Sequence, residues 1–259
     1  MEKPLEDIER RYEQPYGYGQ RPRDIDDASI RAKAASAKPS ERLAGEMFIL
    51  RRRTILDLVT AEQSSARILD VGCGDGQLLA PIAAGRVVWG IDASRKALAQ
   101  AEDRGYAGTH WLNLECDEWP VTEGWFDIVV CPEVIEHVVD TLRLVRSCLK
   151  ALRVGGILIV TTPNAVSLGG RWRLLRGGPI PFSEPFPRGI GHLRSFCPGD
   201  VAELLVAAGA TDVSVRSAPL LLPMLWRHFA WARRQPKLRL LQNMGMFIVA
   251  TGRRPKVGG

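Results

Sequence analysis

Short apolar runs of strand-forming residues alternate with stretches of helical periodicity through the middle of the chain. The apolar runs cover residues 67–71, 87–92, 110–114, 126–131 and 156–162. The helical stretches between them cover residues 76–84, 95–104 and 134–152. This alternation is typical of βαβ units, in which parallel strands are covered by helices on both faces. It predicts a doubly wound α/β fold that binds its ligands at the carboxyl ends of the strands.

The two ends of the chain depart from this pattern. Residues 1–40 are polar and predict a flexible N-terminal arm, and a helix is predicted to begin at Ser40. Residues 163–195 are rich in Gly, Pro and Arg without clear periodicity, and such segments are usually functional or disordered. A helix at 198–208 and strands at 212–215 and 246–251 complete the pattern. We therefore expect one domain over residues 41–259, with an insert at 163–195.

Composition and cysteine usage indicate a cytoplasmic globular protein. Of the 259 residues, 46% are hydrophobic and 25% are charged. The five cysteines are odd in number and include no C-x-x-C pair, which favours reduced thiols over a disulfide framework or a zinc knuckle. The polar first residues do not resemble a signal peptide, and no run reaches the roughly 18 apolar residues of a membrane span.

Positive charge is concentrated in two parts of the sequence. The net charge is +6, and residues 213–259 contain nine Lys or Arg but no Asp or Glu. The insert adds five arginines against the single Glu184: Arg171, Arg173, Arg176, Arg188 and Arg194. Such clusters attract nucleic acid or a membrane surface, but they are equally consistent with a solvated basic face. Segment 220–231 predicts either a helix over the sheet edge or an amphipathic surface for peripheral membrane contact.

A glycine turn follows the first predicted strand and opens the next helix. Its sequence is Asp70-Val71-Gly72-Cys73-Gly74-Asp75-Gly76. Glycines let the backbone approach a ligand closely and adopt positive φ, and a helix start offers free N–H groups to polar atoms. Asp92 ends the second strand, twenty-two residues after Asp70, where a carboxylate can bind ribose hydroxyls. The turn therefore predicts a nucleotide-type ligand.

The third glycine bears on the choice of nucleotide. A dinucleotide-dependent oxidoreductase would carry G-x-G-x-x-G, but Gly76 comes one place early and Gln77 occupies the expected position. The segment instead resembles the first motif of class I S-adenosylmethionine-dependent methyltransferases, a hydrophobic strand followed by D-h-G-x-G-x-G. A catalytically inert nucleotide-binding module with the same turn is a further alternative.

The resemblance extends over about Ile68–Gly209 and implies the Rossmann-like methyltransferase fold, a mostly parallel seven-stranded sheet with an antiparallel last strand. Segments 126–131 and 155–164 resemble its fourth and fifth strands. Segment 192–198 resembles the ubiquinone-biosynthesis O-methyltransferase subgroup, also called methyltransferase type 11. The resemblance implies that S-adenosyl-L-methionine contacts Asp70, Gly72, Cys73, Gly74, Asp75, Gly76, Asp92, Asn113, Leu114 and Cys131.

The family pattern also implies individual roles. Asp70 would approach the methionine ammonium, Asp92 would hold the ribose, and Cys131 would lie beneath the reactive sulfonium. Asn113 stands where the family usually has an Asp that bonds the adenine amine, so this position keeps an acceptor but loses the charge.

A second polar group follows the fourth predicted strand, in Glu133-Val134-Ile135-Glu136-His137. If a helix begins here, Glu133, Glu136 and His137 face one way. Three interpretations stay open. The carboxylates could cap the helix, where negative charge is favourable. His137 could act as a general base, because the ordinary pKa of histidine lies near neutrality. The side chains could instead bind Mg²⁺ or Mn²⁺.

The metal interpretation also rests on a resemblance. Small-RNA 2′-O-methyltransferases carry a similar E-V-I-E-H motif with a later histidine, and ubiquinone-type O-methyltransferases share the E-x-x-E-H spacing. His192 is placed like that later histidine. The resemblance implies catalytic roles for Glu133, His137 and His192, and a metal site of Glu133, Glu136, His137 and His192.

These features predict a methyltransferase that acts on an acceptor oxygen of a small, lipid-linked or saccharide-linked metabolite. The insert would line the acceptor pocket, where Trp172, Phe182 and Phe186 could stack on a ring. RNA 2′-O-methylation is the alternative within the family, although no separate RNA-binding module is visible. The sequence does not indicate an oligomeric state.

Overall fold

The computed structural model describes residue 27 and residues 39–115, 118–179, 192–218 and 243–256. These residues include seven strands: β1 (Arg67–Val71), β2 (Val87–Asp92), β3 (Gly108–Trp111), β4 (Phe126–Pro132), β5 (Leu152–Pro163), β6 (Thr211–Ala218) and β7 (Phe247–Arg253). They form one mixed sheet in the order β3-β2-β1-β4-β5-β7-β6, so the predicted seven-stranded Rossmann-like sheet is confirmed. The chain divides into two compact units, Met1–Pro120 with Phe126–Val130, and Val121–Trp125 with Cys131–Gly259.

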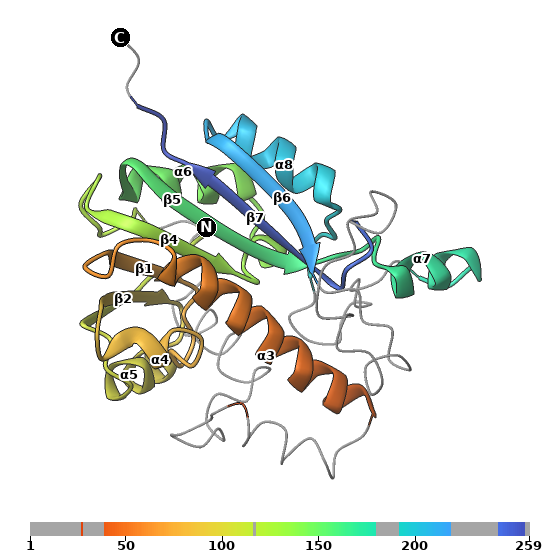
Figure 1. The fold of residues 1–259 in the computed structure, drawn as a ribbon, viewed down its shortest axis with the longest axis horizontal. Helices are drawn as coiled ribbons and strands as arrows, with labels where there is room; N and C mark the ends of the chain where they lie inside the picture. Colours follow the sequence, from red (N-terminus) through yellow and green to blue (C-terminus); the bar gives the residue numbers. More distant parts are fainter. Residues whose placement is uncertain (1–26, 28–38, 116–117, 180–191, 219–242, 257–259) are drawn as a thin grey trace, which may run out of the picture. The chain divides into compact units, whose positions relative to one another are not determined.

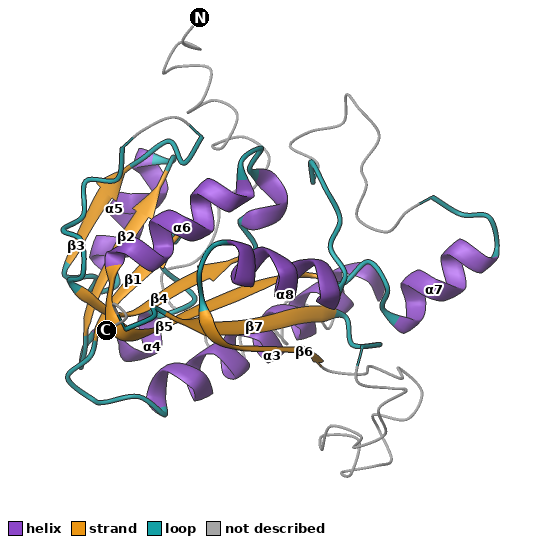
Figure 2. Cartoon of the chain, turned by 90° about the horizontal axis from the view of Figure 1, so that it is seen from above, coloured by secondary structure: helices purple, strands orange, loops and turns teal. Residues whose placement is uncertain are grey.

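The strands of the first unit are parallel. β1 pairs with β2 and with β4, and β2 pairs with β3. Asp70 of β1 lies opposite Gly90 of β2 and Val130 of β4, so the carboxyl ends of these strands lie at one edge. Among its described residues, this unit contains the helices α3 (Pro39–Thr60), α4 (Ala80–Ala83) and α5 (Arg95–Asp103), and α5 packs against β2 and β3 (Figure 2).

Burial on both faces explains the continuous apolar runs in the first unit. Ile68, Leu69 and Val71 of β1 are fully buried, as parallel strands between helix layers require. α5 buries Ala97, Leu98 and Ala101 on one side, and these positions are the helical periodicity seen in the sequence.

The second unit contains the antiparallel part of the sheet. β7 pairs antiparallel with both β5 and β6, which confirms the predicted orientation of the last strand. The part of this unit that the structure describes contains the short 3₁₀ helix η2 (Ile135–His137), α6 (Thr141–Ala151), α7 (Leu168–Leu175) and α8 (Pro198–Ala207). α6 packs against β5 and α8, and α8 packs against β6 and β7, so the two helices cover one face of these strands (Figure 1).

The predicted bounds of most elements are close to those observed. β1 and β2 have the predicted ends, and α5 and α8 each end one residue before the prediction. β3 ends at Trp111 rather than Leu114, because Asn113 and Leu114 already belong to the loop that follows. The predicted helix at 76–84 is shorter than expected, since α4 begins only at Ala80 after the glycine turn.

The predicted helix at 134–152 is wrong in its first half. Residues 135–137 form η2, and α6 begins at Thr141 with Asp140 as its N-cap, whose carboxylate accepts from the Arg143 N–H. The apolar pattern of 134–152 runs across both segments, so periodicity alone did not reveal the break.

The insert at 163–195 contains α7, a helix that the sequence did not predict. Phe182 and Phe186 of the insert, segment 220–231 and nearly all of the arm at 1–40 lie outside the described residues. Within the described ranges, no helix combines the length and apolar character needed to cross a lipid bilayer.

Candidate functional site

The glycine turn after β1 adopts a conformation that requires glycine. Gly72, Gly74 and Gly76 have φ values of 69°, 53° and 76°, in the left-handed region that side chains disfavour. The N–H groups of Gly72 and Cys73 both donate to the carbonyl oxygen of Ile91, at 2.8 and 3.1 Å. The turn is therefore held against the end of β2.

Gly76 also allows a close approach of α5. A Cβ at this position would lie 2.9 Å from the Cα of Ala101 and 2.9 Å from Cε2 of Tyr106. No side chain fits there without a shift of the backbone of α5. This contact explains why a glycine is needed at position 76, one place before the third glycine of a dinucleotide site.

Asp92, predicted to bind ribose, links the turn to the start of α5. Its Oδ2 accepts from the Gly74 N–H at 2.8 Å, and its Oδ1 accepts from the Ser94 N–H at 2.9 Å. Burial raises the pKa of Asp92, and these backbone N–H groups oppose the rise. A carboxylate has about four lone-pair sites, so Asp92 retains acceptor capacity for a ligand.

Asp70 is buried beside Tyr106, a residue that the sequence analysis did not single out. The Tyr106 hydroxyl donates to Asp70 Oδ2 at 2.7 Å and lies 3.3 Å from the carbonyl oxygen of Gly76. Burial raises the pKa of Asp70 to about 7, the Tyr106 hydrogen bond opposes this rise, and the charge of Asp92 adds to it. Asp70 Oδ1 is buried and has no hydrogen-bond partner among the described residues.

The side chain of Asp75 is engaged within the protein. Its Oδ2 accepts from Gln77 Nε2 at 2.7 Å and lies 3.6 Å from Nη2 of Arg104 at the end of α5. Gln77, which replaces the third glycine of a dinucleotide site, therefore holds Asp75 in place. Asp75 is buried, and Gln77 and Arg104 hold its carboxylate within the turn.

The remaining predicted cofactor residues follow β3 and end β4. Asn113 is buried, and its side-chain oxygen accepts from the Glu115 N–H at 3.1 Å. The Leu112 N–H donates to the Asp92 carbonyl oxygen at 3.0 Å, which keeps the Asn113–Leu114 loop beside the end of β2. Cys73 of the turn is buried, and Cys131 is fully buried at the end of β4 in the second unit.

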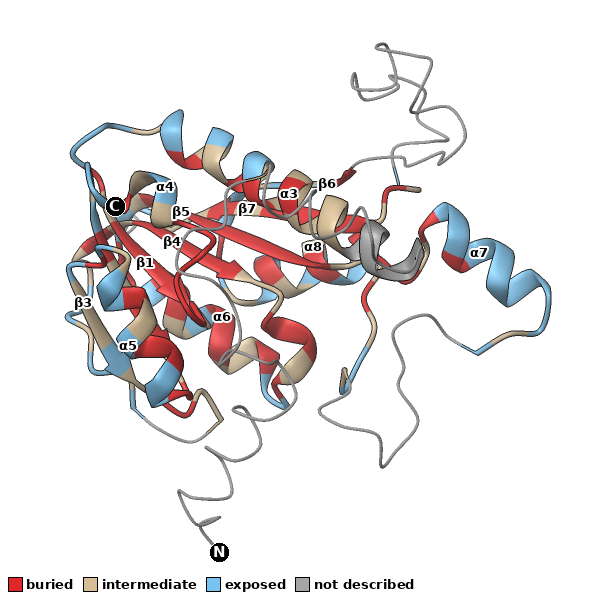
Figure 3. Ribbon diagram, turned by 90° about the horizontal axis from the view of Figure 1, so that it is seen from below, coloured by how far each residue is buried: buried red, intermediate tan, exposed pale blue. Residues whose placement is uncertain are grey.

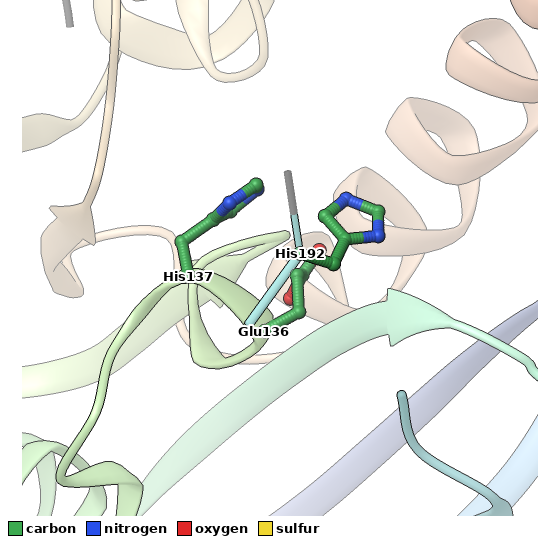
Figure 4. A group of neighbouring side chains, drawn as sticks. All are labelled: Glu136, His137 and His192. Atoms are coloured by element: carbon green, nitrogen blue, oxygen red, sulfur yellow. The ribbon is translucent and has the colours of Figure 1, made fainter. Parts of the chain in front are cut away.

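In the second unit, Glu136, His137 and His192 come together (Figure 4). One possible ligand atom from each side chain lies within 4.8 Å of the others. The two imidazole rings meet edge to face, with centroids 4.7 Å apart and planes at 69°. Glu136 is buried, and its Oε2 accepts from the Thr162 hydroxyl at 2.9 Å.

A backbone hydrogen bond explains how His192 reaches this group. The Leu193 N–H donates to the Glu136 carbonyl oxygen at 2.8 Å, which attaches the segment after the insert to η2. The sequence pairing of E-x-x-E-H with a distant histidine therefore corresponds to a real proximity of Glu136, His137 and His192. We call these three residues the EHH cluster.

Glu133 does not belong to the EHH cluster. It has a φ of 55°, its N–H donates to the Thr161 carbonyl oxygen, and its Oε1 accepts from the Thr161 hydroxyl at 3.2 Å. Because η2 is a single 3₁₀ turn after this left-handed residue, the expectation that Glu133, Glu136 and His137 share one helix face is wrong. The capping interpretation is also wrong for α6, because Asp140 caps that helix.

Comparisons with known proteins add to this picture. The profile of the methyltransferase domain family matches residues 43–215. A probable S-adenosylmethionine-dependent methyltransferase of Mycobacterium tuberculosis is 32% identical over 174 residues, which cover 66% of this chain and 58% of that protein. A ubiquinone biosynthesis O-methyltransferase of Ralstonia nicotianae is 38% identical over 109 residues, 40% of this chain and 45% of that protein. The matched regions thus span less than two thirds of these relatives.

The fold also matches solved structures. A Thermotoga maritima S-adenosylmethionine-dependent methyltransferase, described as a possible histamine N-methyltransferase, superposes with a TM-score of 0.57 and 17% identity. The match covers 88% of this chain and 100% of that one. At this identity the likeness establishes the fold and says nothing of the acceptor.

Proposed function

Because the chain belongs to the class I S-adenosylmethionine-dependent methyltransferases, we propose that it transfers a methyl group to an oxygen atom of a small, lipid-linked or saccharide-linked metabolite. The observation that carries the choice of oxygen is the EHH cluster. A hydroxyl acceptor must lose its proton, and a carboxylate with two imidazoles can take up that proton or bind a cation that lowers the hydroxyl pKa. The ubiquinone biosynthesis O-methyltransferases among the relatives support the same choice.

The residues of the first unit fit S-adenosylmethionine. When bound, it supplies a methyl group on a positively charged sulfur, which leaves without help from an acid. Gly72 and Gly74 carry no side chain that would block close approach to the turn backbone, and Asp92 can accept from ribose hydroxyls. The buried Asp70 Oδ1 calls for a donor, because an unsatisfied buried polar atom is costly, and an ammonium group would provide one. In this proposal Asn113 and Leu114 flank the adenine, and Cys131 lies near the sulfonium.

The EHH cluster also fits a divalent cation. A carboxylate oxygen and two imidazole nitrogens within 4.8 Å of one another can reach one ion, since such ligands bind at about 2.0–2.6 Å. The donor set suits Mn²⁺ or Mg²⁺, with Mn²⁺ the better match to imidazole. The bound ion would lower the pKa of an acceptor hydroxyl; without it, His137 or His192 would take the proton directly.

Metal binding can be tested on the purified full chain with Mn²⁺ as the probe. We expect His192→Ala to weaken Mn²⁺ binding in calorimetry by at least about tenfold, since even the partners of metal ligands contribute this much. His110→Ala, which removes an exposed imidazole on β3, is the matched control and should bind as the wild type does. If a chelator and His192→Ala both leave turnover unchanged, the metal part of the proposal is wrong.

The acceptor can be found by transfer of a labelled methyl group. Cell extract is incubated with the full chain and methyl-deuterated S-adenosylmethionine, and products with the labelled mass shift are identified. We expect the label on an oxygen, and we expect His137→Ala to abolish it. A label on nitrogen or carbon contradicts the proposed acceptor atom but leaves the family assignment intact.

RNA 2′-O-methylation is a second candidate, because the EHH cluster follows the motif of small-RNA 2′-O-methyltransferases and α7 carries exposed arginines. The same labelled cofactor with total RNA tests it. Transfer of label to RNA that survives charge reversal of Arg171, Arg173 and Arg176 would exclude α7 as an RNA clamp. No transfer to RNA would leave the metabolite as the acceptor.

A further inference from the structure

The helix α7 is exposed over almost its whole surface (Figure 3). From residue 168 to residue 177, every residue except Gly170 is exposed to solvent. Apolar side chains account for much of this surface: Leu168, Trp172 and Leu175 are 38%, 60% and 80% exposed. An eight-residue helix with this much exposed apolar area is unusual on a globular protein and indicates a binding surface.

Three of the four exposed apolar side chains of α7 form a stripe, and the fourth, Leu174 at 42% exposed, lies on the side of Gly170. At 3.6 residues per turn, Leu168, Trp172 and Leu175 fall within about 60° of one another around the helix axis. Gly170, the buried residue of the helix, lies on the opposite side. The helix therefore rests on the protein through Gly170 and presents the stripe outward.

Arginines flank the stripe. Arg171 and Arg176 follow its two sides on the helical wheel, and the Arg176 guanidinium lies 5.0 Å from the Trp172 ring centroid. Arg173 adds a third exposed positive charge. No Asp or Glu occurs between Asp140 and Glu184, so the neighbouring sequence does not neutralise these charges.

An apolar stripe with arginines beside it is typical of a surface that binds a lipid bilayer. Trp and Leu side chains bury themselves at the boundary between headgroups and acyl chains, while arginines beside them reach lipid phosphates. A second copy of this chain would account for the stripe but would bring the same arginines face to face, and a protein partner would need acidic groups to match them. Nucleic acid would account for the charges but not for Leu168 and Leu175 facing outward.

We propose that α7 docks this protein on the surface of an anionic phospholipid bilayer, with Leu168, Trp172 and Leu175 inserted among the headgroups and the flanking Arg171 and Arg176 on the phosphates. This docking goes beyond the proposed function, because it requires no particular acceptor. It gives the enzyme access to lipid-linked substrates where the acceptor is one of them.

Co-sedimentation of the full chain with vesicles tests the proposal. We expect binding to vesicles of phosphatidylcholine mixed with phosphatidylglycerol, weaker binding to phosphatidylcholine alone, and loss of binding at high salt. Leu175→Ser should weaken binding to the anionic vesicles about tenfold, through lost apolar burial. Arg176→Gln should weaken it about fivefold, the equivalent of about 1 kcal/mol per charge near such a surface.

Matched variants and controls separate docking from folding. Val206→Ser on α8 removes a side chain that is 61% exposed, and Lys150→Gln removes an exposed charge on α6; both should bind vesicles as the wild type does. All four variants should keep wild-type circular dichroism and S-adenosylmethionine affinity, because α7 lies outside the cofactor residues.

Four results would overturn the proposal. The first is that the wild type binds anionic and neutral vesicles equally well. The second is that the control variants lose as much vesicle binding as the α7 variants. The third is lipid-independent self-association that Leu175→Ser abolishes, which would assign the stripe to a second copy of the chain. The fourth is RNA binding that Arg176→Gln weakens and Leu175→Ser does not. None of these results bears on the methyl transfer, which is measured separately.

Discussion

Asp70 and Tyr106 form a buried pair beneath the glycine turn, and their chemistry is open to direct test. Tyr106→Phe keeps the ring that packs against Gly76 and removes only the hydroxyl that donates to Asp70. We expect a loss of about 1–3 kcal/mol in the free energy of unfolding, measured by urea denaturation, because a buried carboxylate loses its donor.

A matched control for this change is Thr109→Val. It removes an exposed hydroxyl that donates to Glu102 and should cost no more than about 0.5 kcal/mol. Equal losses in the two variants would show that the Tyr106 hydroxyl has no special role.

The raised pKa of Asp70 predicts a pH dependence of stability. The pKa is about 7 in the folded protein against an ordinary 3.8, so the folded state holds a proton that the unfolded state releases. The resulting stabilisation, up to about 4 kcal/mol, is full below the ordinary pKa and is lost as pH rises through about 7. From about pH 5 to pH 8, the free energy of unfolding of the wild type should therefore fall relative to that of Asp70→Asn.

Two comparisons check that result. Asp57→Asn, at an exposed carboxylate of α3, should leave the pH profile of the wild type unchanged. Because the pKa of Asp92 is also raised, the free energy of unfolding of Asp70→Asn should keep part of its dependence on pH. A profile for Asp70→Asn that runs parallel to the wild type would contradict the raised pKa.

Gly76 and Gly85 allow a matched test of the close approach of α5 to the glycine turn. Gly76→Ala places a Cβ 2.9 Å from the Ala101 backbone at a φ of 76°, and should cost about 2–4 kcal/mol and most of the S-adenosylmethionine affinity. A Cβ at Gly85 meets nothing within 4 Å, so Gly85→Ala should fold and bind normally. Both are measured by thermal unfolding and calorimetry, and comparable losses would refute the close approach of α5.

The elements of the fold were predictable where one physical signal dominated. β1, β2 and α5 were placed correctly because continuous apolar runs and helical periodicity reflect burial directly. The break between η2 and α6 was missed because Val138 is buried, so the apolar pattern crosses the break without interruption. α7 was missed because its apolar residues face solvent and its first turn contains Gly169 and Gly170, against the usual pattern of a helix that packs on a core.

The site was predictable to a similar degree. The glycines, Asp92 and the histidines were found from the spacing of sequence motifs. This spacing indicates where the backbone turns and which residues lie at the carboxyl ends of the strands. Tyr106 was missed because its partner Asp70 lies thirty-six residues away and no motif links them. Glu133 was grouped with the EHH cluster because the sequence does not reveal its left-handed φ.

The N-cap of α6 offers a test at the scale of one element. Asp140 accepts from the Arg143 N–H at 2.9 Å, and Asp140→Ala should reduce the free energy of unfolding by about 1 kcal/mol. Glu203→Ala, at an exposed position within α8, should have little effect. If α6 extended back to Val134 as the sequence suggested, Asp140 would lie inside the helix and its replacement by Ala would stabilise the protein instead.

In the molecule as a whole, the predicted cofactor residues of the turn and the EHH cluster belong to different compact units. The first unit carries the glycine turn of the family motif, and the second carries the EHH cluster and α7, on which the proposed acceptor chemistry and membrane docking rest. The family could be identified from the turn motif, whereas no motif in the sequence identifies the acceptor. Fold and cofactor follow from backbone geometry, whereas the acceptor depends on side chains outside the shared motifs.

Calorimetric titration of the full chain shows whether the turn after β1 binds S-adenosylmethionine. We expect saturable binding of S-adenosylmethionine, no comparable binding of nicotinamide dinucleotides, and at least about tenfold weaker S-adenosylmethionine binding in Asp92→Ala, the loss expected for charge-assisted hydrogen bonds. Preferential binding of a dinucleotide, or S-adenosylmethionine binding that Asp92→Ala leaves unchanged, would contradict this expectation.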